Sequence, residues 1–209
     1  MTRRSVEQKA VFLNIPYDLA FERLFLAYIV GLSALELVPH AGLEIPDSTR
    51  RLERVQSLLH QCRYSIHDLS RVQVTRGVPR FNMPFELGLA VGWAQQNPAR
   101  HAWFVCDSKR NRVLRSISDL NGTDVNIHDG TVEGVMRELC NMFVRHDRRP
   151  DVRSMLVSHG QTRKSLREIK QRTGAASLFQ ARAFADVCYF AAGLSQVGAG
   201  GRPDRPEVG

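Results

Sequence analysis

The chain has 209 residues, of which 43% are hydrophobic and 24% charged, and its formal net charge is +8. These values are ordinary for a soluble globular protein and suit one sizeable α/β domain with an appendage. The most apolar late segment, 175–194, contains Gln180, Arg182 and Asp186, which excludes a membrane span.

Strand and helix signals alternate along the chain. Apolar runs flanked by polar residues predict strands at residues 10–15, 37–41, 64–69, 101–106 and 125–127. Helical spacing predicts helices that begin at a cap on Asp18, at Asp47-Ser48, at Pro84, and at a cap on either Asp129 or Thr131. We interpret residues 107–121 as a long loop with one turn.

This alternation predicts a flavodoxin-like, doubly wound α/β fold with a mostly parallel five-stranded sheet and a C-terminal helical extension. The α/β domain is expected over residues 9–149. Residues 150–195 are expected to form a helical hairpin that packs on the sheet domain or on a partner. The Gly- and Pro-rich tail, 196–209, is expected to be disordered.

Polar residues gather where the predicted strands end. Ligands of open parallel sheets bind outside the carboxyl ends of the strands. The candidate site residues at those ends and in the following loops are Asn14, Tyr17, Asp18, Asp68, Ser70, Arg71, Arg80, Asn82 and Glu86.

Glu86 is the strongest candidate for chemistry. Pro84 is favoured at the first helical position, which would place Glu86 in the first turn, where the helix dipole lowers a carboxyl pKa. An ionised carboxylate there can act as a nucleophile or stabilise a cation. The alternative is a residue that only complements the dipole, and the local sequence alone favours that alternative.

Asp68 closes an apolar strand, so a ligand could reach it at the sheet edge. It could equally cap a turn through an Asx hydrogen bond to Ser70 or Arg71. Alternation along the strand points His67 away from Asp68, which favours a packing role for His67.

Several kinds of site are not indicated. No histidine pair has helical ligand spacing and no Cys/His cluster occurs, so a metal site is not expected. Glycine motifs for dinucleotides and P-loops, and the G-x-S-x-G elbow, are absent. The four cysteines are widely spaced within apolar or helical patterns, which indicates buried reduced thiols. With no signal peptide at the start, we expect a cytoplasmic protein.

Three segments carry a family resemblance: Val11–Asn14, Ile66–Ser70 and Phe85–Ala90. Together they resemble the nucleoside 2-deoxyribosyltransferase-like superfamily, which is related in fold and site to TIR domains and other glycosidases that act on NAD. The likeness covers residues 9–146. It implies that Glu86 attacks or stabilises the anomeric carbon of a ribosyl group, and that Asp68 binds the sugar or assists the base. The segment from Asn14 to Asp18 would then enclose the ligand.

The expected function is that of an N-glycosidase or ribosyl-transferring enzyme acting on a nucleotide. NAD is the first candidate, as substrate rather than cofactor, and bacterial defence or signalling is the expected setting. Arg71 and Arg80 would bind phosphates. The resemblance to assembly-activated TIR-like enzymes implies a homo-oligomer. A non-enzymatic nucleotide-sensing module is the main alternative, and a basic protein that contacts nucleic acid through the region after residue 150 is less favoured.

Overall fold

A computed structural model describes residues 9–45, 50–72, 80–144 and 150–199. Five strands form one all-parallel sheet of order β2-β1-β3-β4-β5, which confirms the expected flavodoxin-like fold. The strands are β1 (Ala10–Asn14), β2 (Val38–His40), β3 (Tyr64–Asp68), β4 (Ala102–Asp107) and β5 (Val125–Ile127).

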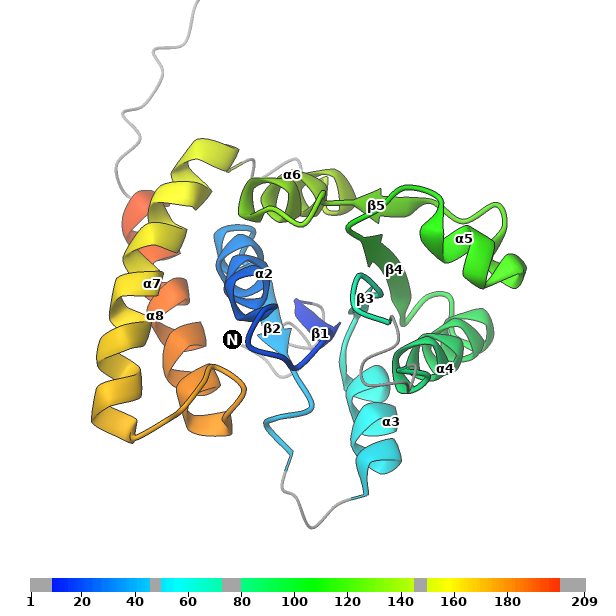
Figure 1. Ribbon diagram of the computed structural model, residues 1–209, viewed down its shortest axis with the longest axis horizontal. Coiled ribbons are helices and arrows are strands. Elements are labelled where there is room, and N and C mark those ends of the chain that lie inside the picture. Colours follow the sequence, from blue (N-terminus) through cyan, green and yellow to red (C-terminus); the bar gives the residue numbers. More distant parts are fainter. Residues whose placement is uncertain (1–8, 46–49, 73–79, 145–149, 200–209) are drawn as a thin grey trace, which may run out of the picture.

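Helices connect and cover the strands (Figure 1). They are α2 (Glu22–Ala34), α3 (Arg51–Gln61), α4 (Asn82–Gln96), α5 (Arg112–Ser116), the 3-10 helix η1 (Ser118–Leu120), α6 (Val132–Met142), α7 (Val152–Thr173) and α8 (Ala181–Ala199). None of the helices in the described ranges is long and apolar enough to cross a membrane.

The strand order assigns each helix to a face of the sheet. The chain moves outward from β1 to β2 and then returns past β1 to β3, so right-handed connections place α2 on one face and α3 on the other. Helices α4 and α5 follow α3, whereas α6 returns to pack beside α2. The direction of the strand order reverses between β1 and β3, where ligand crevices form in folds of this type.

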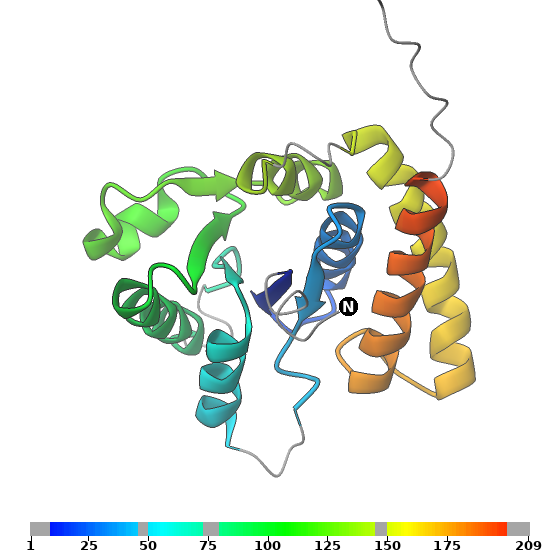
Figure 2. The ribbon, with the colours of Figure 1, turned by 180° about the vertical axis from the view of Figure 1, so that it is seen from behind.

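Helix α2 is buried on nearly all sides, with an unbroken run of buried residues from Leu24 to Ser33. The sheet covers one side of it, and the α7–α8 hairpin lies along the other (Figures 1 and 2). A helix that is apolar all round needs such double cover. The hairpin therefore packs on the sheet domain and shares its main hydrophobic core.

Phe25 and Glu22 of α2 both contact the hairpin region. The ring of Phe25 stacks on Phe184 with 5.5 Å between ring centroids. The Glu22 carboxylate accepts hydrogen bonds from Lys170 Nζ at 2.8 Å and from the backbone N–H of Leu178 at 2.7 Å. The chain that leads into α8 is thereby held close to the carboxyl end of β1.

Some predicted boundaries were wrong. The expected start of the second helix, Asp47-Ser48, lies outside the described residues, and α3 begins at Arg51. The predicted loop 107–121 contains α5 and η1. Helix α8 continues to Ala199, so residues 196–199 are helical, and the rest of the predicted tail lies outside the described residues.

The structure tests the predicted caps of α6 and α2. Thr131 rather than Asp129 caps α6, since its Oγ1 accepts from the backbone N–H of Gly134 at 2.9 Å. Asp18 does not cap α2 directly: its Oδ1 accepts from the N–H of Phe21 at 3.0 Å, which closes the turn that precedes the helix.

Candidate functional site

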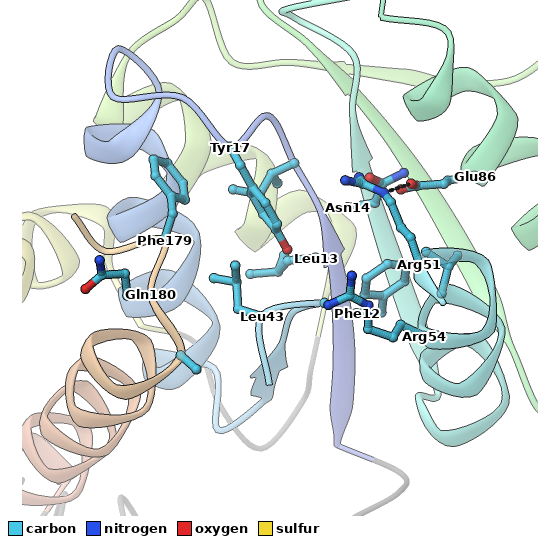
Figure 3. A pocket seen from close by; sticks show the side chains of 14 residues that line it. Phe12, Leu13, Asn14, Tyr17, Leu43, Arg51, Arg54, Glu86, Phe179 and Gln180 are labelled. Carbon is cyan, nitrogen blue, oxygen red and sulfur yellow. Dashed lines mark hydrogen bonds and ion pairs between the residues drawn. The ribbon is translucent and has the colours of Figure 1, made fainter. Parts of the chain in front are cut away.

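A pocket of about 390 Å³ opens at the carboxyl end of β1, at the reversal of strand order. Small-molecule sites usually measure about 300–1,000 Å³. Its walls come from the end of β1, the loop after β2, the first turns of α3, the side chain of Glu86 on α4, and residues 179–181 at the start of α8. Figure 3 shows this arrangement.

Glu86 lines the pocket with only 6% of its side chain exposed. Helix α4 begins at Asn82, so Pro84 is its third residue and Glu86 its fifth, beyond the first turn. The expected dipole effect is therefore wrong. Burial raises the pKa of Glu86, and the charge and hydrogen bond of Arg51, with a hydrogen bond from Asn82, only partly oppose it.

Arg51 and Arg54 supply positive charge to one wall of the pocket. Arg51 Nε donates to Glu86 Oε1 at 3.0 Å, while 59% of the Arg51 side chain stays exposed (Figure 3). Arg54 lies one turn further along α3. Both were missed from the sequence because they do not follow a strand directly. Their signal is a pair of arginines, one turn apart, at the start of the helix after β2, a strand that ends at the same sheet edge.

The opposite wall in Figure 3 is aromatic. Tyr17 packs on Phe179 with 5.5 Å between ring centroids, and on Phe25 with 6.3 Å. Burial of its hydroxyl raises the pKa of Tyr17, against the opposing effect of Arg51, so the group is a protonated donor at neutral pH. Phe179 was also missed, because only the folded hairpin brings it to the sheet edge.

Asn14 stands at the end of β1 and is 3% exposed. Its Nδ2 lies 3.0 Å from His67 Nδ1. A buried chain continues from there: His67 Nε2 to Ser65 Oγ at 2.9 Å, Ser65 Oγ to His101 Nε2 at 2.9 Å, and His101 Nδ1 to the carbonyl oxygen of Cys62 at 2.9 Å. Burial, followed by the influence of His101, lowers the pKa of His67 to about 3.

Asp68 does not line this pocket. It is fully buried and accepts hydrogen bonds from the Tyr28 hydroxyl at 2.8 Å, from the backbone N–H of Ser70 at 2.9 Å and from the Ser70 hydroxyl, with His128 Nε2 at 3.0 Å. Tyr28 belongs to α2, so Asp68 faces the side of the sheet opposite to α4. The structure shows the Asx turn to Ser70, and it does not bring Asp68 or Ser70 together with Glu86.

Asp18 pairs with both candidate phosphate-binding arginines. Its Oδ2 lies 3.2 Å from Arg71 Nε and 3.3 Å from Arg80 Nη1. None of these three residues lines the pocket. Asn82 lies at the start of α4 and reaches the site through its hydrogen bond to Glu86. The intervening residues 73–79 lie outside the described ranges.

No group of three or more His, Cys, Asp or Glu side chains within the described ranges is placed to hold a metal ion. Comparisons with known proteins give no match: no family model fits the chain, and no curated protein or solved structure is significantly similar to it. Function must therefore be inferred from the residues of the pocket.

Proposed function

We propose that this chain is an N-glycosidase that cleaves the base–ribose bond of a nucleotide, with a pyridinium nucleotide such as NAD as its first candidate substrate. One observation carries the proposal: Glu86 is buried at a pocket of nucleotide-compatible size, and it is the one acidic residue among the described residues that line it.

The chemistry suits a single carboxylate. Cleavage breaks the bond between the anomeric carbon and the base nitrogen, and the bonding electron pair leaves with the base. The sugar passes through an oxocarbenium-like state that Glu86 stabilises or traps covalently. Water or another hydroxyl then adds its oxygen to the anomeric carbon and loses a proton. A pyridinium base leaves as a neutral molecule and needs no proton, whereas a neutral purine usually needs an acid.

The other walls support the same class of substrate. Arg51 and Arg54 provide guanidinium groups that suit phosphate oxygens. The rings of Tyr17 and Phe179 offer apolar faces for a base or a sugar. Asp68 has no step in this proposal because it lies outside the pocket.

The likeness of three sequence segments to deoxyribosyltransferase- and TIR-like enzymes also supports the proposal, since it marks Glu86, on the helix after β3. Homo-oligomerisation and a role in bacterial defence or signalling belong to the proposal through that resemblance alone, and a cytoplasmic location is also part of the proposal. Light scattering of the purified protein tests the homo-oligomer.

The test is release of free base. Purified protein is incubated with NAD, nicotinamide mononucleotide and the common nucleoside monophosphates, and the products are separated by liquid chromatography. We expect free nicotinamide, with a rate about 10³-fold lower in Glu86→Gln. Glu53→Gln, an exposed change in the first turn of α3, is the matched control and keeps the wild-type rate. No release from any substrate, or full activity of Glu86→Gln, refutes the enzymatic proposal.

A nucleotide-sensing module is the second candidate. The Arg51–Glu86 ion pair favours it, because the guanidinium offsets the charge that catalysis would use. This alternative predicts that a nucleotide raises the melting temperature of the protein, that the ligand is recovered intact, and that Glu86→Gln still binds.

A further inference from the structure

The buried chain of hydrogen bonds from Cys62 to Asn14 runs in one donor-to-acceptor direction, which the carbonyl oxygen of Cys62 determines. A carbonyl oxygen carries no hydrogen, so the nitrogen 2.9 Å from it, His101 Nδ1, must be the donor. Burial lowers the pKa of His101, so its ring is neutral and carries a single N–H. His101 Nε2 is therefore an acceptor.

The donor and acceptor roles of the remaining groups follow in order along these hydrogen bonds. Ser65 Oγ must donate its hydrogen to His101 Nε2, so it accepts from His67 Nε2. His67 is neutral because burial depresses its pKa, and with Nε2 protonated its Nδ1 is an acceptor. Asn14 Nδ2 satisfies that acceptor at 3.0 Å.

The reverse direction of hydrogen-bond donation is unfavourable at the Cys62 end. If the Asn14 amide were turned over, its oxygen would need a proton on His67 Nδ1, and the Ser65 hydroxyl would then donate to His67 Nε2. His101 would have to carry its proton on Nε2, and its bare Nδ1 would face the Cys62 carbonyl. Two acceptors would meet in a buried place, at a cost of about 1–3 kcal/mol or more.

The Asn14 amide is therefore held with its nitrogen toward His67 and its oxygen free. Among the described residues no hydrogen bond to Asn14 Oδ1 is found, and the residue, which is 97% buried, lines the pocket. We infer that Asn14 Oδ1 accepts a hydrogen bond from a sugar hydroxyl of the ligand, and that His67, Ser65 and His101 are positioning residues that set this orientation.

The choice of a sugar hydroxyl rests on the proposed function. If Glu86 acts at the anomeric carbon, other groups that line the same pocket can face the ribose ring, and Asn14 is one of them (Figure 3). A fixed acceptor discriminates against a sugar that lacks the matching hydroxyl, since Asn14 would then remain unpaired.

The positioning chain is tested without any ligand. In protein labelled with ¹⁵N-histidine, long-range ¹H–¹⁵N spectra separate the two tautomers. We expect the Nε2–H form for His67 and the Nδ1–H form for His101, both neutral at pH 7.5. The opposite tautomer at either ring overturns the inference.

The ligand contact is tested by calorimetry. Adenosine 5′-monophosphate and its 2′-deoxy and 3′-deoxy analogues are titrated into full-length Glu86→Gln protein, in which the bond should survive. We expect one deoxy analogue to bind about tenfold more weakly, which is the loss of one hydrogen bond. Adding Asn14→Ala should reduce this ratio to about twofold or less. Adding Asn126→Ala, a control in the middle of β5 and outside the pocket, should keep this ratio.

The outcomes distinguish the enzymatic proposal from the proposed contact of Asn14 with a sugar hydroxyl. Expected tautomers with the hydroxyl discrimination, but no release of base by wild-type protein from any substrate, refute the enzymatic proposal and leave the Asn14 contact standing. Equal binding of the three probes, unchanged discrimination after Asn14→Ala, or no binding of any probe overturns the Asn14 contact.

Discussion

His67 should make this protein acid-sensitive. Burial lowers its pKa from 6.5 to about 3. In the unfolded chain the ring takes up a proton as the pH falls through about 6.5, whereas the folded protein holds it neutral until about pH 3. The unfolded state therefore binds more protons in that window, and stability falls as the pH is lowered through it.

The magnitude follows from the two pKa values. Between the two pKa values of His67 the free energy of unfolding falls by about 5 kcal/mol, and about 3 kcal/mol of this loss occurs between pH 6.5 and pH 4. The variant His67→Gln removes the titration but keeps a side chain that can donate and accept. It should lose about 1–2 kcal/mol at pH 7.5 through poorer hydrogen bonds. At pH 4 the order should invert, with the variant more stable than the wild type by about 1–2 kcal/mol.

Urea unfolding at pH 7.5 and pH 4, followed by tryptophan fluorescence, measures both differences. His159, whose pKa is also lowered by burial, has no contact with His67 and contributes equally in both proteins. His60→Gln, an exposed change on α3, is the matched control and should show no inversion. A wild-type-to-variant difference that is equal at the two pH values would refute the assignment of a neutral, buried His67.

Four further substitutions have expected outcomes. Because burial raises the pKa of Glu86, its charged form costs stability above that pKa; Glu86→Gln should resist urea better than wild type at pH 8, and the gain should vanish below about pH 4.5. Gly134→Ala would put a Cβ 2.0 Å from the backbone oxygen of His128, which should destabilise the fold by about 3 kcal/mol. The added Cβ of Gly92→Ala meets nothing within 4 Å, so this change should stabilise the fold by about 0.5–1 kcal/mol. Urea unfolding measures both differences. Arg51→Gln should raise the carboxyl pKa of Glu86 further, seen by ¹³C titration, and should weaken binding of adenosine 5′-monophosphate about tenfold.

The fold was predictable because local patterns and tertiary structure agree. Strand β1, which is apolar except for its last residue Asn14, is buried along its whole length, as a central strand should be. Helix α2 shows a part of the tertiary structure that local sequence patterns do not predict. Helical spacing predicted this helix, but its buried run from Leu24 to Ser33 also contacts the hairpin. Nothing in the spacing of α2 says which later segment covers it.

The pocket was predictable in part for the same reason. Asn14, Tyr17 and Glu86 line it as residues near strand ends and at the following helix, which topology places at one edge of the sheet. Phe179 comes from a segment more than 160 positions after Asn14, and only the docking of α8 on α2 brings it there. Arg51 depends on the path of a loop whose residues 46–49 lie outside the described ranges.

The pairing of Asp68 with Glu86 fails for a reason that the sequence already contains. Successive side chains of a strand point to opposite faces, so Ser65 and His67 share one face of β3, while Ile66 and Asp68 share the other. Ile66 lies in the core beneath α2, which places Asp68 there with Tyr28. The right-handed connections put α4, and with it Glu86, on the opposite face. A strand end thus specifies an edge of the sheet but not a face. The contribution of β3 to the Glu86 side is His67, which acts on the pocket through the orientation of Asn14.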